Sequence, residues 1–276
     1  MTDFIAISKK EHKSFRFSKP TNWAFAKKEN ICKICLAEIK QIAEKQVIVF
    51  LEEKKDTFGL YTIQGFEKTN NLYVTDDGGW LSNYVPAYYR MQPFNFLMDS
   101  NTNNLVLCFD ENTKLIGKNL EKDHSYPMFD KKENPSPELL ETISLSKKFL
   151  ESSKETANIV ALLADLNLIE QWPIKLKFED EEKQIDGIYR INQKKLYNLK
   201  STDVFTLFKN HGLELVYSQI ISMNNTTYLK QLHYQLKKFS KVISKDKSLR
   251  DQAIERQQKE EIEEVNNLVN DLLSDD

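Results

Sequence analysis

Two aspartates at predicted strand ends and two arginines are the groups of this chain best placed to do chemistry. Asp110 ends an apolar run, and Asp186 comes just before a second one. Strand ends hold carboxylates rigidly, which suits acid–base or electrostatic roles. Arg90 and Arg190 could clamp a carboxylate or phosphate of a ligand through paired N–H donors. The interpretation we favour is internal pairing with the two aspartates, which at such positions are more often turn or capping residues.

Established catalytic and metal-binding motifs are missing from the sequence. It contains no Walker loop, no GxGxxG and no GxSxG. The four histidines form no HxH, HxD or HxxxH pair, and His12, beside three lysines, is the one kept as a candidate. Cys32 and Cys35 form a lone CxxC, whereas a structural zinc normally needs four ligands. We therefore expect no metal and no cofactor, and we place both cysteines on the buried face of a helix.

Residues 79–94 have the most unusual composition in the chain. Five of these sixteen residues are Trp, Tyr or Phe, and they stand beside Arg90 and two prolines. Such a cluster forms either an irregular core seam or a binding wall, since these rings combine large rigid surfaces with directed hydrogen bonds. We call residues 80–90 the aromatic–Arg wall. The candidate ligand-binding residues are Trp80, Asn83, Tyr84, Tyr88, Tyr89, Arg90, Asp110, Asp186, Tyr189, Arg190 and His12.

Composition limits the classes of protein to which the chain can belong. Its 276 residues are 40% apolar and 29% charged, as expected for a globular protein. A formal net charge of −2 gives no reason to expect nucleic acid. Apolar runs fall short of the ~18 residues that span a bilayer. The first residues lack the charge order of a secretory signal, so we expect a cytoplasmic location.

Hydrophobic periodicity predicts an α+β protein. The N-terminal half should hold a helix at 30–45 and a mixed sheet, with helices packed on it, from strands at 47–51, 58–63, 72–74, 94–98 and 105–109. Residues 111–136 are rich in turn formers. The mainly helical second half should hold helices at 137–151, 153–168, 193–199, 202–210 and 212–222, and a hairpin of 174–178 with 187–191.

The C-terminal segment differs in composition from the rest. An apolar stripe repeats every three or four residues from 229 to 243, lapses, and returns from 262 within a strongly acidic stretch. We therefore predict a globular domain over 1–240 and an acidic helical tail over 241–276 that engages a partner.

Three motifs in order carry a resemblance to a known family. They are the stretch from Trp80 to Phe94, the stretch from Cys108 to Glu111, and the stretch from Asp186 to Asn192. In this combination the chain resembles the SapC family over about residues 5–235. The resemblance implies a role in surface-layer (S-layer) or surface-protein export. The chain departs from the family pattern at Lys131, where a glycine usually stands.

Three functional hypotheses remain open. The leading one is a non-catalytic accessory protein in surface-layer biogenesis, with a protein partner, whose aromatic–Arg wall holds a peptide segment or small ligand. The second is an enzyme for a polypeptide or an anionic metabolite, with a site assembled from Asp110, Arg90, Tyr89, Asp186, Arg190 and His12. The third is a scaffold that associates through a helical tail. The enzyme hypothesis requires its side chains to converge on one cleft.

Overall fold

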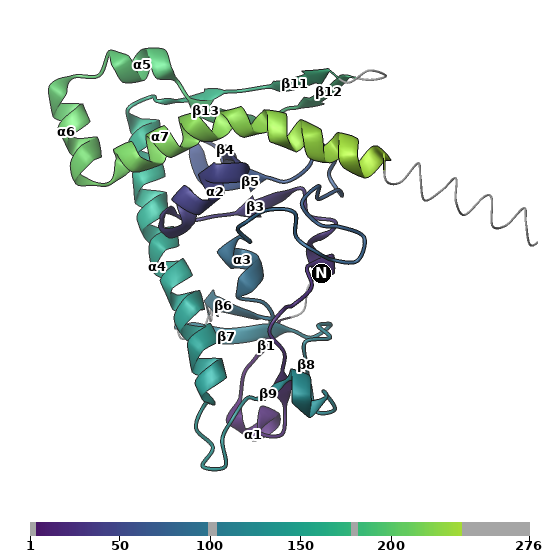
Figure 1. Cartoon of the computed structure of the whole chain (residues 1–276). Coiled ribbons are helices and arrows are strands. Elements are labelled where there is room, and N and C mark those ends of the chain that lie inside the picture. Colours follow the sequence, from purple (N-terminus) through teal and green to yellow (C-terminus); the bar gives the residue numbers. More distant parts are fainter. Residues whose placement is uncertain (1–3, 99–103, 178–181, 239–276) are drawn as a thin grey trace, which may run out of the picture. The chain divides into compact units, whose positions relative to one another are not determined.

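A computed structural model describes residues 4–98, 104–177 and 182–238 (Figure 1). The chain divides into two compact units, Met1–Leu229 and Lys230–Asp276. Of the second unit, the structure describes residues 230–238, which are helical. The first unit contains every candidate residue named above, and the following paragraphs concern that unit.

A five-stranded antiparallel sheet forms the larger layer of the first unit. Its strand order is β10 (Ile169–Gln171), β13 (Ile188–Ile191), β4 (Val47–Lys54), β5 (Thr57–Ile63) and β3 (Ile31–Lys33). The central pair, β4 and β5, is a hairpin that turns at Asp56, a residue with a φ of 59°. Strand β4 is a continuous apolar run at its start, which is typical of a strand buried on both faces.

A smaller sheet carries Asp110. Its order is β1 (Phe4–Ala6), β7 (Leu105–Asp110) and β6 (Phe94–Met98), and both pairings are antiparallel. Two further groups of strands are β8 (Ile116–Gly117) with β2 (Arg16–Phe17) and β9 (Tyr126–Pro127), and the hairpin of β11 (Ile174–Lys177) with β12 (Glu182–Ile185). Because Asp110 pairs with Phe4 at the end of β7, its carboxylate is held at a strand terminus as the sequence indicates.

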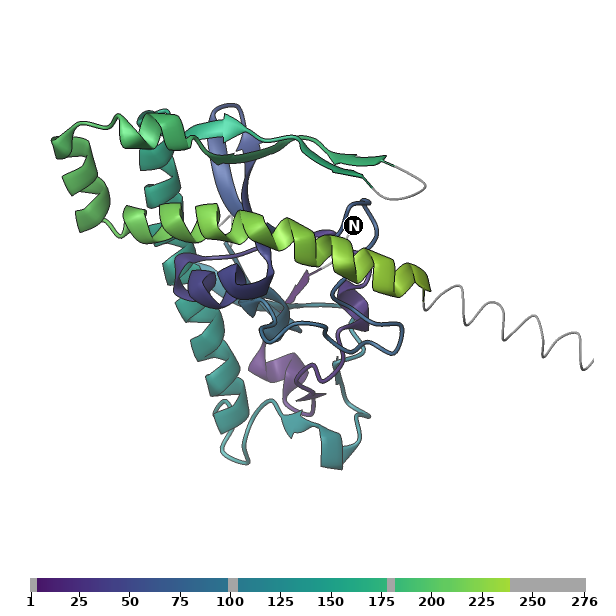
Figure 2. The same cartoon turned by 45° about the horizontal axis from the view of Figure 1, so that its top comes forward.

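The long helix α4 (Pro137–Asp165) contacts both main sheets, through β5 and β6 (Figures 1 and 2). It begins where predicted: the Ser136 side chain accepts a hydrogen bond from Leu139 N–H at 3.2 Å, and proline occupies the first turn. The other labelled α-helices are α1 (Lys9–His12), α2 (Ile39–Lys45), α3 (Ala87–Arg90), α5 (Gln193–Tyr197), α6 (Ser201–Lys209) and α7 (Gly212–Ser222), and residues 226–229 are helical as well. The 3₁₀ turns are η1 (Ala24–Ala26), η2 (Leu36–Glu38), η3 (Lys122–His124) and η4 (Met223–Asn225).

Buried side chains gather in separate clusters that follow these layers. The largest joins the five-stranded sheet to α2, α4 and α7, with Phe50 and Leu163 inside it. A second lies at the small sheet and includes Phe94 and Phe109. A third contains Ala26, Cys32, Val74 and Tyr89, with Trp23, Trp80, Val85 and Tyr88 packed against it. The aromatic–Arg wall is therefore partly a core element.

The α+β prediction is confirmed. Strands occur at 47–54, 57–63, 94–98 and 105–110, and the last two pair as expected. These four strands divide between two antiparallel sheets. Helices α5, α6 and α7 match the predicted ranges closely. The predictions for the acidic tail beyond residue 238 lie outside the described residues.

The predicted helix at 30–45 is wrong in its first half. Residues 31–33 form β3, which pairs with β5, and Cys32 is buried between exposed Ile31 and Lys33. The helical α2 begins at Ile39. Three alternating residues fit an edge strand as well as a helix turn, so the tertiary pairing decided the outcome. Both cysteines are buried as predicted, but Cys32 lies in β3 and Cys35 just before η2, so the prediction that they lie on a helix face is wrong.

Three further predictions of secondary structure are wrong. Residues 72–74 form no strand and contribute an isolated bridge, Val74 with Trp80. The two helices expected over 137–168 are the single helix α4. Strand β11 pairs with β12, while β13 lies between β10 and β4, so the predicted hairpin has the wrong partner.

No helix among the described residues combines the length and apolar character that crossing a membrane requires.

Candidate ligand-binding site

The aromatic–Arg wall has a defined local conformation. A turn over residues 75–79, in which Gly78 has a φ of 85°, leads into it. Pro86 then caps the four-residue helix α3, and Gln92–Pro93 is a cis peptide. Proline fixes φ and pushes the preceding residue away from helical geometry, so α3 starts and stops within a few residues. The short helix presents Tyr88, Tyr89 and Arg90 in succession.

Trp80 packs mainly against other rings. Its indole stacks on Tyr73 at 5.6 Å between centroids and meets Trp23 and Tyr89 edge to face. The indole N–H donates to the Tyr84 carbonyl at 2.9 Å. Tyr73 itself is fully buried. Trp80 is half-buried, and its contacts with neighbouring rings stabilise the wall.

Tyr89 is a buried residue of the wall. It is 2% exposed, and its hydroxyl donates to Gln64 Oε1 at 2.7 Å. The same oxygen accepts from Asn71 Nδ2 at 2.8 Å, whereas Gln64 Nε2 has no partner among the described residues. Burial, followed by the nearby Cys32 thiol, raises the pKa of Tyr89. Its phenol is therefore a neutral hydrogen-bond donor.

A cavity of about 640 Å³ lies beside the wall. Tyr88, Tyr89 and Asp110, all predicted as site residues, line it together. The remaining lining residues are Phe4, Asn22, Phe25, Glu29, Gln92, Asn112, Thr113, Lys114 and Leu115. Phe25 meets Tyr89 edge to face at 5.9 Å. The cavity thus combines residues from the N-terminal segment, α3 and the end of β7.

The chemistry of this cavity, which we call the aromatic cavity, is acidic and aromatic. Two carboxylates, Glu29 and Asp110, face one cation, Lys114. Asp110 Oδ1 accepts from Asn112 N–H at 2.9 Å, and among the described residues the other oxygen accepts no hydrogen bond. Phe25 is 46% exposed, which is high for so large an apolar ring. A cation held between carboxylates and ring faces gains both ion pairing and cation–π attraction.

Arg90 faces away from this cavity. Its Nε donates to the Val85 carbonyl at 3.0 Å and its Nη2 to the Tyr84 hydroxyl at 2.6 Å. The Tyr84 hydroxyl in turn donates to Glu38 Oε2 at 3.1 Å, and Ala87 N–H donates to the same oxygen at 2.7 Å. Glu38 is 3% exposed, and burial raises its pKa despite these bonds. The chain from Arg90 to Glu38 ties α3 to η2.

The other predicted site residues lie elsewhere and have local partners. Asn83 is exposed and donates to Glu44. In the five-stranded sheet, the Tyr189 hydroxyl donates to Glu52 at 3.1 Å and Arg190 Nε to Glu170 at 2.9 Å.

The two remaining candidates, Asp186 and His12, do not line the cavity either. Asp186 accepts from Gln184 at 2.6 Å and is exposed. His12 is buried edge to face against Phe15 and Phe109. The favoured pairing of the arginines with Asp110 and Asp186 is therefore wrong: Arg190 pairs with Glu170, and Arg90 bonds to Tyr84 and Val85.

Sequence reasoning missed Phe25, Glu29, Lys114 and the buried Glu38. Phe25 belongs to a series of rings in the N-terminal segment, which is a usable but weak signal. Glu38 lies among apolar residues 34–43, where a carboxylate must find partners if it is buried. Nothing in the local sequence indicates Glu29 or Lys114, because both reach the cavity through tertiary folding.

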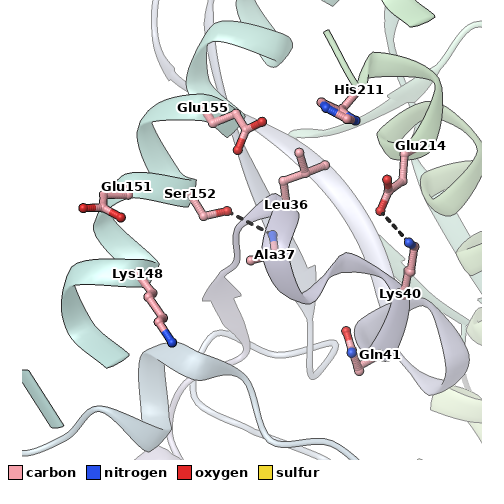
Figure 3. Close-up of a pocket in the computed structure, with 10 residues that line it drawn as sticks. All are labelled: Leu36, Ala37, Lys40, Gln41, Lys148, Glu151, Ser152, Glu155, His211 and Glu214. Atoms are coloured by element: carbon pink, nitrogen blue, oxygen red, sulfur yellow. Dashed lines mark hydrogen bonds and ion pairs between the residues drawn. The ribbon is translucent and has the colours of Figure 1, made fainter. Parts of the chain in front are cut away.

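A second, polar cavity of about 600 Å³ lies between η2, α2, α4 and the start of α7 (Figure 3). Its charged lining residues are Lys40, Lys148, Glu151, Glu155 and Glu214, with His211 beside them. Lys40 and Glu214 pair at 3.3 Å across it. Ser152 accepts from Ala37 N–H at 3.0 Å. Among the described residues, no three His, Cys, Asp or Glu side chains come close enough to hold a metal.

A family model described as SapC matches residues 7–229. The chain belongs to the SapC family. The SapC match includes the aromatic–Arg wall, every lining residue of the aromatic cavity except Phe4, and the whole of the five-stranded sheet. Comparisons with curated proteins and with solved structures give no match.

Proposed function

We propose that this SapC family member is a non-catalytic binding protein that captures a polypeptide segment in the aromatic cavity. The observation that carries the proposal is the meeting of Phe25, Tyr88, Tyr89 and Asp110, from three parts of the chain, around one cavity of about 640 Å³. A volume of this size is typical of ligand sites. The SapC resemblance supports a client among surface-layer or surface-exported proteins, with this protein as a cytoplasmic accessory factor.

The lining favours a ligand side chain that is cationic and flanked by apolar groups. Glu29 and Asp110 supply negative charge, while Phe25 and Tyr88 supply ring surface. A lysine or arginine of an extended peptide can place its charge at the carboxylates and its methylene stem along the rings. The side chains of the enzyme hypothesis do not all line this cavity, since Arg190, Asp186 and His12 bond to other groups, and this supports the binding proposal.

The test is a titration with two synthetic tetrapeptides, Ac-Gly-Lys-Phe-Gly-NH₂ and its Glu-for-Lys counterpart, followed by calorimetry and by amide NMR shifts. We expect saturable binding of the lysine peptide, with shifts at residues that line the aromatic cavity. The Tyr88→Ala and Asp110→Asn variants should each weaken binding by about 0.5–1 kcal/mol, the scale of one exposed cation–π contact or one exposed ion pair.

Two variants serve as matched controls. Tyr197→Ala removes an exposed tyrosine that is 74% accessible and outside the cavity. Asp130→Asn changes an aspartate whose Oδ1 accepts from Lys132 N–H, in the same kind of turn as Asp110. Both should bind like the unmodified protein. Equal affinity for the two peptides, or no effect of Tyr88→Ala and Asp110→Asn, would remove the proposal.

A further inference from the structure

A third cavity, of about 400 Å³, is lined by residues of α3 and α4. Its lining residues are Lys19, Arg90, Glu141, Thr142, Ser144, Leu145 and Lys148. Three cations therefore face one carboxylate. We call it the basic cavity. Helix α3 contributes to both cavities, since Tyr88 and Tyr89 line one and Arg90 lines the other.

Helix α4 supplies one wall of the basic cavity. Glu141, Ser144, Leu145 and Lys148 are spaced by three or four residues, so they lie along one face of the helix. Thr142 uses its hydroxyl to donate to the Glu138 carbonyl at 3.1 Å. Lys148 also borders the polar cavity, at the end away from His211 (Figure 3).

The charges of the basic cavity are only partly neutralised. Glu141 pairs with Lys19 at 2.6 Å. Arg90 bonds to a carbonyl and a phenol, neither of which is a carboxylate. Lys148 forms no ion pair with any described residue. Two positive charges thus remain without a direct counter-ion around a hollow surface.

Arg90 is also held in place before any ligand arrives. Its guanidinium carbon lies 4.9 Å from the centroid of the Tyr84 ring, and its Nε and Nη2 are fixed by the Val85 carbonyl and the Tyr84 hydroxyl. The remaining N–H groups of a guanidinium are arranged to meet two oxygens of one anion. A fixed donor loses less side-chain freedom on binding, which favours affinity.

We propose that the basic cavity binds a phosphate monoester through Arg90, Lys148 and Lys19. The two unpaired positive charges match a phosphate dianion better than a single carboxylate, and most of a phosphate monoester is dianionic above pH ~6. Ser144 adds a hydroxyl donor at the rim. This site is independent of the peptide proposal, because the two cavities share no lining residue.

The test uses phenyl phosphate, with benzoate as the carboxylate comparison. Binding is followed by calorimetry and by the Arg90 Nε–Hε NMR signal. We expect saturable binding of phenyl phosphate that is several-fold tighter than that of benzoate. Arg90→Lys should weaken it about tenfold or more, as expected for loss of a charged paired hydrogen bond. Lys148→Gln should weaken it about 2- to 5-fold, as expected for an exposed ion pair.

Glu141→Gln gives a test of opposite sign. It releases Lys19 from its present partner, so phenyl phosphate should bind about 2- to 5-fold more tightly. Lys147→Gln is the matched control, since Lys147 is exposed on the same helix and does not line the cavity. Lys40→Gln is a control for binding in the polar cavity, because Lys40 lines that cavity whereas Lys19 and Arg90 do not.

These surface variants of Lys148 and Glu141 keep the test decisive if the Arg90 variant fails to fold. The proposal is overturned by an Arg90 signal that does not saturate up to roughly 10 mM phenyl phosphate. It is equally overturned if benzoate binds as tightly as phenyl phosphate, or if Lys147→Gln and Lys148→Gln have the same effect.

Discussion

The buried carboxylate of Glu38 provides the sharpest test of how the wall is held. Four hydrogen bonds converge on it, from Ala87 N–H at 2.7 Å, the Tyr84 hydroxyl at 3.1 Å, Cys35 N–H at 3.3 Å and the Cys35 thiol at 3.9 Å. These bonds and the charge of Arg90 lower the pKa of Glu38, but burial is the largest effect and raises it overall. The ionised carboxylate is therefore tolerated in the folded state at a cost.

The perturbation is Glu38→Gln, which keeps the volume of the side chain and cannot ionise. One of the two oxygens is replaced by an NH₂ group, which cannot accept from the donor that faces it, whereas the hydroxyl oxygen of the protonated acid can; this should cost about 1–3 kcal/mol of unfolding free energy at low pH. Because the pKa of Glu38 is raised on folding, the stability that the native residue contributes is fully present below the unfolded-state pKa of about 4.3. It is lost as the pH rises through the folded-state pKa.

The advantage of the native protein over Glu38→Gln should therefore shrink as the pH rises from about 4.3 through the folded-state pKa of Glu38. Each unit by which folding raises the pKa removes about 1.4 kcal/mol of that advantage. The assay is urea unfolding followed by tryptophan fluorescence, since Trp23 and Trp80 pack against the wall. An advantage that stays constant or grows with pH would refute the reasoning.

Glu53→Gln supplies a control with the opposite sign. Glu53 accepts from Lys33 Nζ at 2.8 Å and from the Tyr61 hydroxyl at 2.6 Å, and these bonds lower its pKa. Its contribution to stability is therefore present above the unfolded-state pKa and is lost as the pH falls through the folded-state pKa. At acidic pH, the stability advantage of the native protein over Glu53→Gln should increase as the pH rises. The stability advantage over Glu38→Gln is greatest in that same acidic range.

Two further predictions concern the segments around the aromatic cavity. Gly78→Ala should destabilise the protein by about 3 kcal/mol and Gly187→Ala by only about 1 kcal/mol, although both positions have a positive φ. Only at Gly78 would the new Cβ lie 2.0 Å from the Asn22 amide oxygen, which must then give up its bond to Ala24 N–H. Equal losses of unfolding free energy in urea would contradict this prediction. Burial raises the pKa of the Cys32 thiol and raises that of Cys35 to about 11, so a thiol reagent at neutral pH should modify both only after unfolding, and rapid labelling of the native protein would contradict their burial.

The local sequence predicted the secondary structure correctly wherever local interactions determine it. The β-branched run at 47–51 is the buried core of β4, and Ser136 with Pro137 starts α4 as predicted. Prediction failed where a distant partner decided. Two helices were predicted over 137–168, yet α4 is continuous, and its Ser152 and Thr156 accept backbone N–H bonds from η2.

The candidate site shows the same division. Tyr88, Tyr89 and Asp110 were identified from composition and from position at a strand end, and they meet in one cavity. Arg190 and Asp186 also stand at a predicted strand, but Arg190 lies in β13 of the five-stranded sheet and Asp186 lies between β12 and β13, so neither lines this cavity. Sequence spacing cannot distinguish these cases, because it does not specify which strands become neighbours.

By itself, the sequence determined the α+β class, the SapC resemblance, most strand and helix positions, and an aromatic segment pinned by prolines. These follow from side-chain periodicity, capping and backbone restriction, all of which act over a few residues. Only the tertiary structure decided that Phe25 and Glu29 face Asp110, that Arg90 faces a basic cavity, and that Glu38 is buried. The physical reason is that such meetings depend on which apolar surfaces pack together across the whole chain, and that choice is not encoded in any single stretch.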